Sequence, residues 1–253
     1  MSAAPHATIF DLDGTLTVSK SPLTSEMGAT LARLLLKMPV AVMSGGSYTQ
    51  FQKQFLGGMP PDAHFGNLYL FPTSAAQCYT WENGEWQLLY NNALTPEERS
   101  QVLGALAESL KETGLDEPPQ QLWGEQIEDR GSQITWSALG QQAPVEIKTA
   151  WDQDRKKRMP LQAALLKRIP NFSVRANATS SIDITRTGIT KAYGVRQLSE
   201  ILHIPISDML YVGDALFPGG NDEIVKESGI ATQQVSGPAE TAKVIEKVLS
   251  AQE

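Results

Sequence analysis

A short apolar segment that ends in two aspartates constrains the fold of this chain most strongly. Residues 7–10 read Ala-Thr-Ile-Phe, and Asp11, Leu12, Asp13 and Gly14 follow directly. An apolar run of this length is typical of a buried parallel strand, and Gly14 allows a sharp turn after it. Two nearby carboxylates repel each other unless a cation lies between them, and ligands of α/β sheets bind where strands end. The segment therefore predicts a metal-binding, catalytic strand end, although a surface turn would also use these residue types.

Composition and charge argue against a disulfide-linked, membrane or nucleic-acid-binding protein. Cys78 is the single cysteine, so no intramolecular disulfide can form. Residues 1–8 lack the basic and apolar regions of a signal peptide, and Arg33 and Lys37 interrupt the most apolar stretch, residues 31–43. We therefore expect a reducing, cytoplasmic setting and no membrane segment. The net charge of -7 disfavours nonspecific contact with phosphate backbones, so we expect no nucleic-acid partner.

A second apolar run ends in small, hydrogen-bonding residues. Residues 39–43 stop at Ser44, and Gly45 continues the loop. We expect helices over residues 25–37 before this run and 49–55 after it. Because free N–H groups at a helix start attract anions, Ser44 is a candidate phosphate ligand. An ordinary helix cap followed by a loop would show the same pattern.

The middle of the chain has a different pattern, with shorter strands. The expected strands are residues 68–71, a hairpin of 77–81 and 85–90 around Asn83-Gly84, and then 126–128, 133–136, 145–151, 172–176 and 181–185. Helices are expected over residues 95–113 and 155–168. This order predicts an antiparallel sheet with helices on one face.

Alternating strands and helices resume after residue 188. We expect helices over residues 191–202, 221–228 and 239–249, and strands over 209–212 and 229–234. The pattern predicts a parallel α/β core that an insert interrupts. We place the core in residues 1–85 and 187–253 and the insert in 86–186.

Another apolar strand ends at an acid, Asp214. Because acids follow two strands of one core, Asp214 and Asp222 can meet Asp11 and the carbonyl of Asp13 at one edge of the sheet. Oxygen ligands of this kind suit a hard cation that keeps several waters, so we predict a Mg²⁺ site. Asn221 is expected to cap the helix after it.

Four motifs together resemble those of the haloacid dehalogenase superfamily. They are Asp11-Leu12-Asp13-Gly14-Thr15, Ser44, Lys191, and Gly213-Asp214 with Asn221-Asp222. The resemblance implies a Rossmann-like parallel-sheet core with an inserted α+β cap domain, an antiparallel sheet plus helices. It also implies that Asp11 attacks phosphorus to form an aspartyl-phosphate and that Asp13 acts as general acid and base. Lys191, Ser44 and the metal would neutralise charge on the transferring phosphoryl group.

Within the superfamily, the large insert resembles the type II cap, and Gly213-Asp214 with the segment Pro218-Gly219-Gly220-Asn221-Asp222 resembles eukaryotic-type phosphomannomutases, as does the overall length. The resemblance implies binding of a phosphorylated sugar by these residues: Lys20, Arg130, Gln141, Lys148, Ser181 and Asp183. It further implies a hexose bisphosphate activator and a homodimer formed through the cap.

The cap departs from the family pattern at two positions. Gln141 and Lys148 stand where the family carries arginines, and Arg130 keeps a third. Arginine holds phosphate with a bidentate fork, whereas lysine is a point charge and glutamine is neutral. Two activities are compatible with these departures. One is a phosphomannomutase-like isomerase that converts mannose 6-phosphate to mannose 1-phosphate; the other is a sugar-phosphate phosphatase, a hydrolase that uses the same Asp11. A non-catalytic phospho-sugar-binding protein is a third reading, but no acid of the site is missing.

A basic run, residues 155–158, begins the helix expected over 155–168. On an acidic chain we interpret this run as a solvated helix face rather than a nucleic-acid contact. The tryptophans are expected to pack the insert, and Trp136 is the one candidate for stacking on a sugar.

Overall fold

The computed structural model describes residues 4–176 and 179–252. The chain divides into two compact units, Met1–Asn91 with Ile189–Glu253, and Asn92–Gly188. The first unit extends beyond residue 85 because the hairpin strand over Glu85–Asn91 belongs to its sheet. An α/β core with an inserted α+β unit is confirmed, and no described helix is long and apolar enough to cross a membrane.

The first unit contains a seven-stranded sheet in the order β11-β10-β1-β2-β3-β4-β5. Its strands are β1 (Ala7–Asp11), β2 (Val40–Met43), β3 (Leu68–Phe71), β4 (Gln77–Glu82), β5 (Glu85–Asn91), β10 (Met209–Gly213) and β11 (Ala231–Gln234). The strands from β11 to β3 run parallel, and β4 pairs antiparallel with both β3 and β5. The carboxyl ends of β1, β2 and β10 therefore lie at one edge of the sheet.

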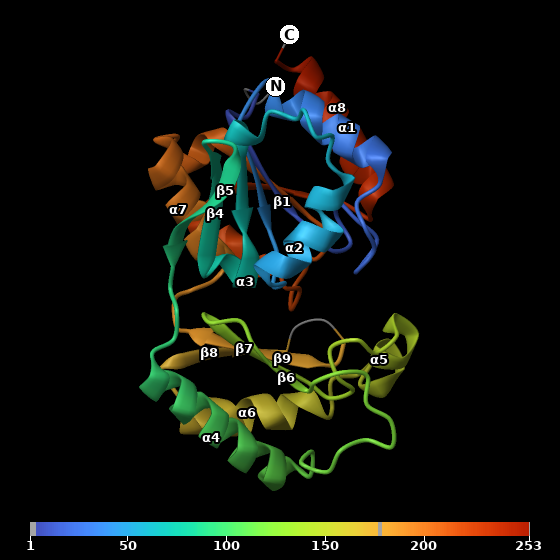
Figure 1. Cartoon of the computed structure of the whole chain (residues 1–253), viewed down its shortest axis with the longest axis vertical. Coiled ribbons are helices and arrows are strands. Elements are labelled where there is room, and N and C mark those ends of the chain that lie inside the picture. The colour runs from blue at the N-terminus through green and yellow to red at the C-terminus, as the bar shows by residue number, and fades with distance from the viewer. Residues whose placement is uncertain (1–3, 177–178, 253) are drawn as a thin grey trace. The chain divides into compact units, whose positions relative to one another are not determined.

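Helices cover both faces of this sheet (Figure 1). They are α1 (Ser25–Leu35), α2 (Tyr48–Gln54), α3 (Pro72–Ala75), α7 (Lys191–Leu202) and α8 (Pro238–Ser250), with 3₁₀ turns η1 (Leu56–Gly58), η2 (Phe65–Asn67), η3 (Ile206–Asp208) and η4 (Glu223–Ser228). Phe10 of β1 packs with α1 and α8, whereas Ile9 packs in a separate cluster with α7. Because side chains alternate along a strand, Asp11 points to the same face as Ile9, toward α7.

The second unit contains a four-stranded antiparallel sheet in the order β6-β7-β9-β8. Its elements are α4 (Pro96–Thr113), β6 (Ile127–Asp129), β7 (Gln133–Ser137), α5 (Val145–Trp151), α6 (Arg158–Arg168), β8 (Phe172–Arg175) and β9 (Ser181–Arg186). Leu106 of α4 and Leu165 of α6 pack with Ile134, Trp136 and Ile184 of the sheet, so the expected helices lie on one face (Figure 1). Trp136 is only 2% exposed and belongs to this core.

The strand predicted over residues 145–151 is wrong, because this segment forms helix α5. Val145 and Ile147 alternate like strand residues, yet both are exposed. Lys148 N donates to the carbonyl of Pro144 at 3.0 Å, which is a helical hydrogen bond. A segment this short does not reveal its period, and the preceding proline favours a helix start.

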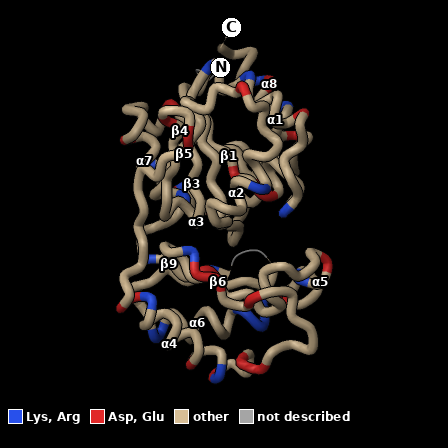
Figure 2. The backbone as a smooth tube through the Cα atoms, in the orientation of Figure 1, with Lys and Arg blue, Asp and Glu red and all other residues tan. Residues whose placement is uncertain are grey.

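The basic run over residues 155–158 is not uniformly solvated, so that prediction is wrong for Arg158. Lys156 is exposed and pairs with Asp154, whereas Arg158 is 2% exposed and its Nε donates to Asp152 Oδ2 at 2.8 Å. Asp152 also accepts from the backbone N–H groups of Lys157 and Arg158. Figure 2 shows Lys and Arg interspersed with Asp and Glu along the chain.

Breaking the buried pair should destabilise the second unit. Replacement of Arg158 by Met keeps much of its volume but leaves the Asp152 carboxylate buried without its partner. We expect the free energy of unfolding, measured by urea titration and circular dichroism, to fall by about 3–5 kcal/mol. The matched control, Lys156→Met, removes an exposed pair and should leave the free energy of unfolding unchanged. Equal effects of the two substitutions would contradict the structural role of Arg158.

Candidate active site

Residues from both sides of the insert converge at the end of β1. Lys191, the first residue of α7, donates from Nζ to Asp11 Oδ1 and to Asp222 Oδ1, the latter at 2.5 Å. Thr190 caps α7 by accepting from the N–H of Tyr193. The Lys191–Asp11 pair joins residues 180 positions apart in the chain. The fold thus places an ammonium group directly beside the carboxylate that ends β1.

Burial determines the electrostatics of this cluster. Asp11, Lys191 and Asp222 are all buried. Burial raises the pKa of Asp11, the Lys191 ammonium opposes this, and Asp222 adds to it. Burial lowers the pKa of Lys191, but the carboxylates of Asp11 and Asp222 more than offset that effect, and the net direction is upward. Lys191 is therefore a permanent positive charge at neutral pH.

Three carboxylates form an acidic group that could hold a cation. Asp11, Asp214 and Asp222 each offer an oxygen, and these atoms lie within 4.8 Å of one another. Burial and the Asp222 charge raise the pKa of Asp214. In the part of the chain that the structure describes, Asp11 Oδ2 is buried and has no hydrogen-bond partner. Mutual repulsion and an unpartnered buried oxygen both fit a hard divalent cation with oxygen ligands.

Two glycines allow the acids to approach the strand ends closely. Gly14 has φ +83, and a Cβ there would lie 2.6 Å from Asp214 Oδ2. A Cβ at Gly213 would lie 2.5 Å from Asp222 Oδ2. Any side chain at either position would displace a carboxylate of the acidic group.

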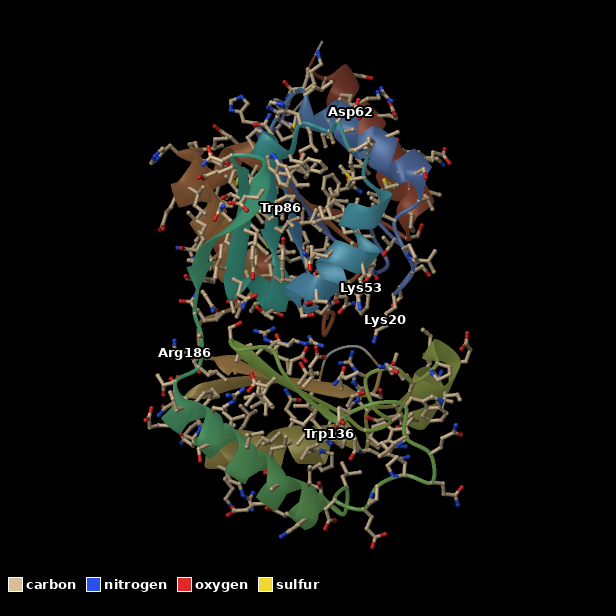
Figure 3. The ribbon with its side chains drawn as sticks, viewed as in Figure 1. Lys20, Lys53, Asp62, Trp86, Trp136 and Arg186 are labelled. Carbon is tan, nitrogen blue, oxygen red and sulfur yellow. The ribbon has the colours of Figure 1, made fainter. Side chains whose placement is uncertain are left out.

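Asp13 lies two residues after Asp11 but its carboxylate is outside the acidic group. Asp13 Oδ1 accepts from the backbone N–H of Lys20 at 2.5 Å and from Gln54 Nε2 at 2.8 Å. The sequence assigned the carbonyl of Asp13, not its side chain, to the metal. The side chain of Lys20 is exposed, and Figure 3 shows Lys20 and Lys53 at the same end of the first unit.

Ser44 follows β2, which pairs directly with β1. Asp11 pairs with Met43 in the parallel register, and Ser44 is 4% exposed. Its Oγ accepts from the N–H of Gly46 at 3.1 Å, across Gly45 in the same loop. Ser44 therefore lies at the sheet edge that carries Asp11.

A left-handed turn supports the Ser44 loop. Thr73 and Ser74 in α3 have φ values of 51 and 56, in a left-handed region that residues other than glycine rarely adopt. Their N–H groups donate to the carbonyls of Gly46 at 2.8 Å and Ser44 at 2.9 Å. Strained backbone held in this way is frequent next to functional sites.

The expected cap at Asn221 does not form. The segment after it is a 3₁₀ turn, η4, which Asp222 precedes without a side-chain capping bond, and Asn221 is exposed. Asp222 instead accepts hydrogen bonds from Lys191 and from the N–H of Ala215 at 3.3 Å. The Asp222 side chain therefore takes part in the charge cluster and does not cap the turn that follows it.

The second unit brings some of the predicted substrate residues together. Lys148 is buried, and its Nζ donates to the carbonyl of Gln141 at 2.8 Å. The Gln141 amide nitrogen is buried without a hydrogen-bond partner among the described residues. Arg130 pairs with Glu128 at 2.7 Å.

Ser181 and Asp183 lie on β9 with one residue between them, so they share one face of the sheet. Thr135 on β7 donates to Asp183 Oδ1 at 2.7 Å. This contact orients the Asp183 carboxylate on that face.

The sequence analysis assigns no individual role to three residues of the first site. The hydroxyl of Tyr211 donates to Asp222 Oδ1 at 2.7 Å, and that of Thr15 to Asp214 Oδ1 at 3.2 Å. Gln54 reaches Asp13 from α2. Strand alternation would have placed Tyr211 on the same face as Asp11, but its apolar neighbours resemble ordinary core. No local signal indicates Gln54, because its role depends on where α2 packs.

Comparisons with known proteins identify the family of this chain. A family model described as eukaryotic phosphomannomutase matches residues 27–251, so the match begins after the Asp11 motif. A phosphomannomutase of Spinacia oleracea is 26% identical over 251 residues, 96% of this chain and 96% of that protein. A phosphomannomutase of Saccharomyces cerevisiae is 25% identical over 248 residues, 96% of this chain and 93% of that protein.

Solved structures share the fold at lower sequence identity. An ATP-bound IMP-nucleotidase of Plasmodium falciparum superposes with a TM-score of 0.75 at 15% identity, over 98% of this chain and 61% of that one. A haloacid dehalogenase-like hydrolase from Bacteroides thetaiotaomicron gives a TM-score of 0.64 at 17% identity, over 96% and 99%. The family model covers most of the chain, and the curated relatives match along nearly their whole length. The chain therefore belongs to the eukaryotic phosphomannomutase family.

Proposed function

We propose that this protein is a phosphomannomutase-like enzyme that interconverts mannose 6-phosphate and mannose 1-phosphate through phosphorylated Asp11. The observation that carries the proposal is the buried Asp11 carboxylate with the Lys191 ammonium bonded to it. Family membership supports a phosphorylated sugar as substrate.

Asp11 and Asp13 divide the chemistry between them. Lys191 orients the Asp11 carboxylate, which attacks phosphorus as the bond from phosphorus to the sugar oxygen breaks. Asp13 donates a proton to that leaving oxygen and takes one from the incoming hydroxyl in the return transfer. The positive charge of Lys191 stabilises the negative charge on the transferring group.

Asp11, Asp214, Asp222 and the carbonyl of Asp13 would hold Mg²⁺. The cation, when bound, supplies charge neutralisation and orientation to the phosphoryl oxygens. The acidic group and the unpartnered Asp11 Oδ2 support this assignment.

Ser44 and Lys20 would contact the substrate from the first unit. Residues of the second unit would bind the sugar and its distal phosphate: Arg130, Gln141, Lys148, Ser181 and Asp183. Lys148 Nζ donates to the backbone carbonyl of Gln141, so the Lys148 ammonium lies next to the Gln141 backbone. A hexose bisphosphate activator and a homodimer through the cap stay predictions from the family resemblance.

Loss of the nucleophile should abolish phosphoryl transfer. We expect Asp11→Asn to lower kcat at least about a thousandfold and to eliminate the phosphorylated Asp11 peptide in mass spectrometry after an acid quench. Asp62→Asn is the matched control, because Asp62 is exposed and lies at the other end of the first unit from Lys20 (Figure 3). Unchanged turnover in Asp11→Asn would refute the covalent mechanism.

The fate of the phosphoryl group separates mutase from phosphatase. With mannose 1-phosphate and glucose 1,6-bisphosphate, we expect mannose 6-phosphate to form faster than inorganic phosphate, because the phosphoenzyme must survive until the sugar hydroxyl attacks. Coupled assays measure both products in one reaction. Release of phosphate with no mannose 6-phosphate would favour the phosphatase.

Cation binding should be visible without turnover. Mg²⁺ at about 100 times its Kd stabilises a folded protein by about 2.7 kcal/mol, so the melting temperature of the EDTA-treated protein should rise on addition of Mg²⁺. Asp214→Asn removes one ligand and should lose most of the rise, whereas Asp62→Asn should keep it. A full rise in Asp214→Asn would contradict the assignment of Asp214.

A further inference from the structure

The side-chain amide of Gln54 is bonded to the carboxylate of Asp13. Gln54 is the last residue of α2 and is 6% exposed. Its Nε2 donates to Asp13 Oδ1 at 2.8 Å and to Thr17 Oγ1 at 3.0 Å. Both N–H groups of one buried amide are therefore directed at the loop that follows β1.

The orientation of this amide is defined from its other side. Gln54 Oε1 accepts from Gln50 Nε2 at 3.0 Å, and the backbone carbonyl of Gln54 accepts from the N–H of Leu23 at 2.7 Å. The Thr17 hydroxyl in turn donates to the carbonyl of Leu12 at 3.3 Å. Because both the oxygen and the nitrogen of the side-chain amide have hydrogen-bond partners, these bonds resist rotation of the Gln54 side chain.

The two oxygens of Asp13 have different surroundings. Oδ1 receives the Gln54 amide and the N–H of Lys20. Among the residues that the structure describes, no group donates to Oδ2. Oδ1 is therefore held by two donors, whereas Oδ2 keeps its acceptor positions open.

We propose that Gln54 is a positioning residue for Asp13. It holds Oδ1 so that Oδ2 points to the sugar oxygen that gains or loses a proton. The inference rests on the proposed function, since it assumes that Asp13 is the general acid and base. A glutamine that served only to fill the space behind the loop would not affect proton transfer selectively.

Substrates differ in their need for that proton. When mannose 1-phosphate reacts with phospho-Asp11, the sugar hydroxyl loses its proton to Asp13 as it bonds to phosphorus and the Asp11–phosphorus bond breaks. When p-nitrophenyl phosphate phosphorylates Asp11, p-nitrophenolate leaves as a stable anion and takes no proton. The first reaction depends on Asp13, and the second does not.

Gln54→Leu keeps the size of the side chain and removes both N–H donors. We expect kcat/KM for mannose 1-phosphate, measured with glucose 1,6-bisphosphate, to fall about tenfold or more. For p-nitrophenyl phosphate, kcat/KM includes only the steps up to the release of p-nitrophenolate. We therefore expect this kcat/KM to stay within about threefold of the value for the unsubstituted enzyme. The KM for mannose 1-phosphate should not rise, because Gln54 does not bind the sugar. The ratio of the two kcat/KM values, taken on one preparation, does not depend on the fraction of folded enzyme.

Controls separate positioning from packing. Gln52→Leu makes the same change on the exposed face of α2 and should leave both kcat/KM values unchanged. Gln54→Ala should give the same altered ratio as Gln54→Leu, even if it unfolds at a lower temperature, and Asp13→Asn should change the ratio in the same direction.

Three results would overturn the inference. They are an equal loss on both substrates, no loss on either, and a loss on mannose 1-phosphate carried by KM alone. If the unsubstituted enzyme forms phospho-Asp11 and turns over mannose 1-phosphate, such a result removes the role of Gln54 only. If it does neither, the proposed function itself fails, and the role of Gln54 fails with it.

Discussion

The ion pairs of Lys191 with Asp11 and Asp222 are the interaction on which the site depends. Asp11 ends the first strand of the chain, whereas Lys191 and Asp222 follow the inserted unit. Buried charges are costly unless they are paired, so each of these groups requires the others. The cluster therefore locks together the two segments of a discontinuous unit and sets the orientation of the proposed nucleophile.

Around this cluster, the sheet decides which side chains can meet. Parallel pairing brings the ends of β1, β2 and β10 to one edge, and strand alternation turns Asp11 and Tyr211 toward α7. Glycines at positions 14 and 213 provide the space for two carboxylates. The carboxylates of Asp11, Asp214 and Asp222 repel one another, and a bound cation would relieve that repulsion. The same edge receives Gln54 from α2, next to the second acid.

Much of the fold was predictable, because long apolar strands and amphipathic helices carry a clear period. The core strands, the hairpin around Asn83-Gly84 and helices such as α4, with its capping box at Thr95, all appear as expected. Two of the predictions that are wrong concern a segment too short to show its period and a side chain whose partner lies outside the basic run. Residues 145–151 alternate like a strand but fold as α5, and Arg158 leaves the basic run to pair with buried Asp152. Burial and pairing are not visible in a one-dimensional pattern.

The sequence by itself determined the chemical groups: two acids after one strand, an acid after another, a serine, a lysine and the glycines that let them approach. These follow from local rules, since residue type and strand ends are properties of short segments. Only the tertiary structure decided that Lys191 bridges Asp11 and Asp222, that Tyr211 and Gln54 join the network, and that Asn221 does not cap a helix. The physical reason is that hydrogen bonds between residues far apart in the chain depend on packing, which brings their atoms within about 3 Å of each other.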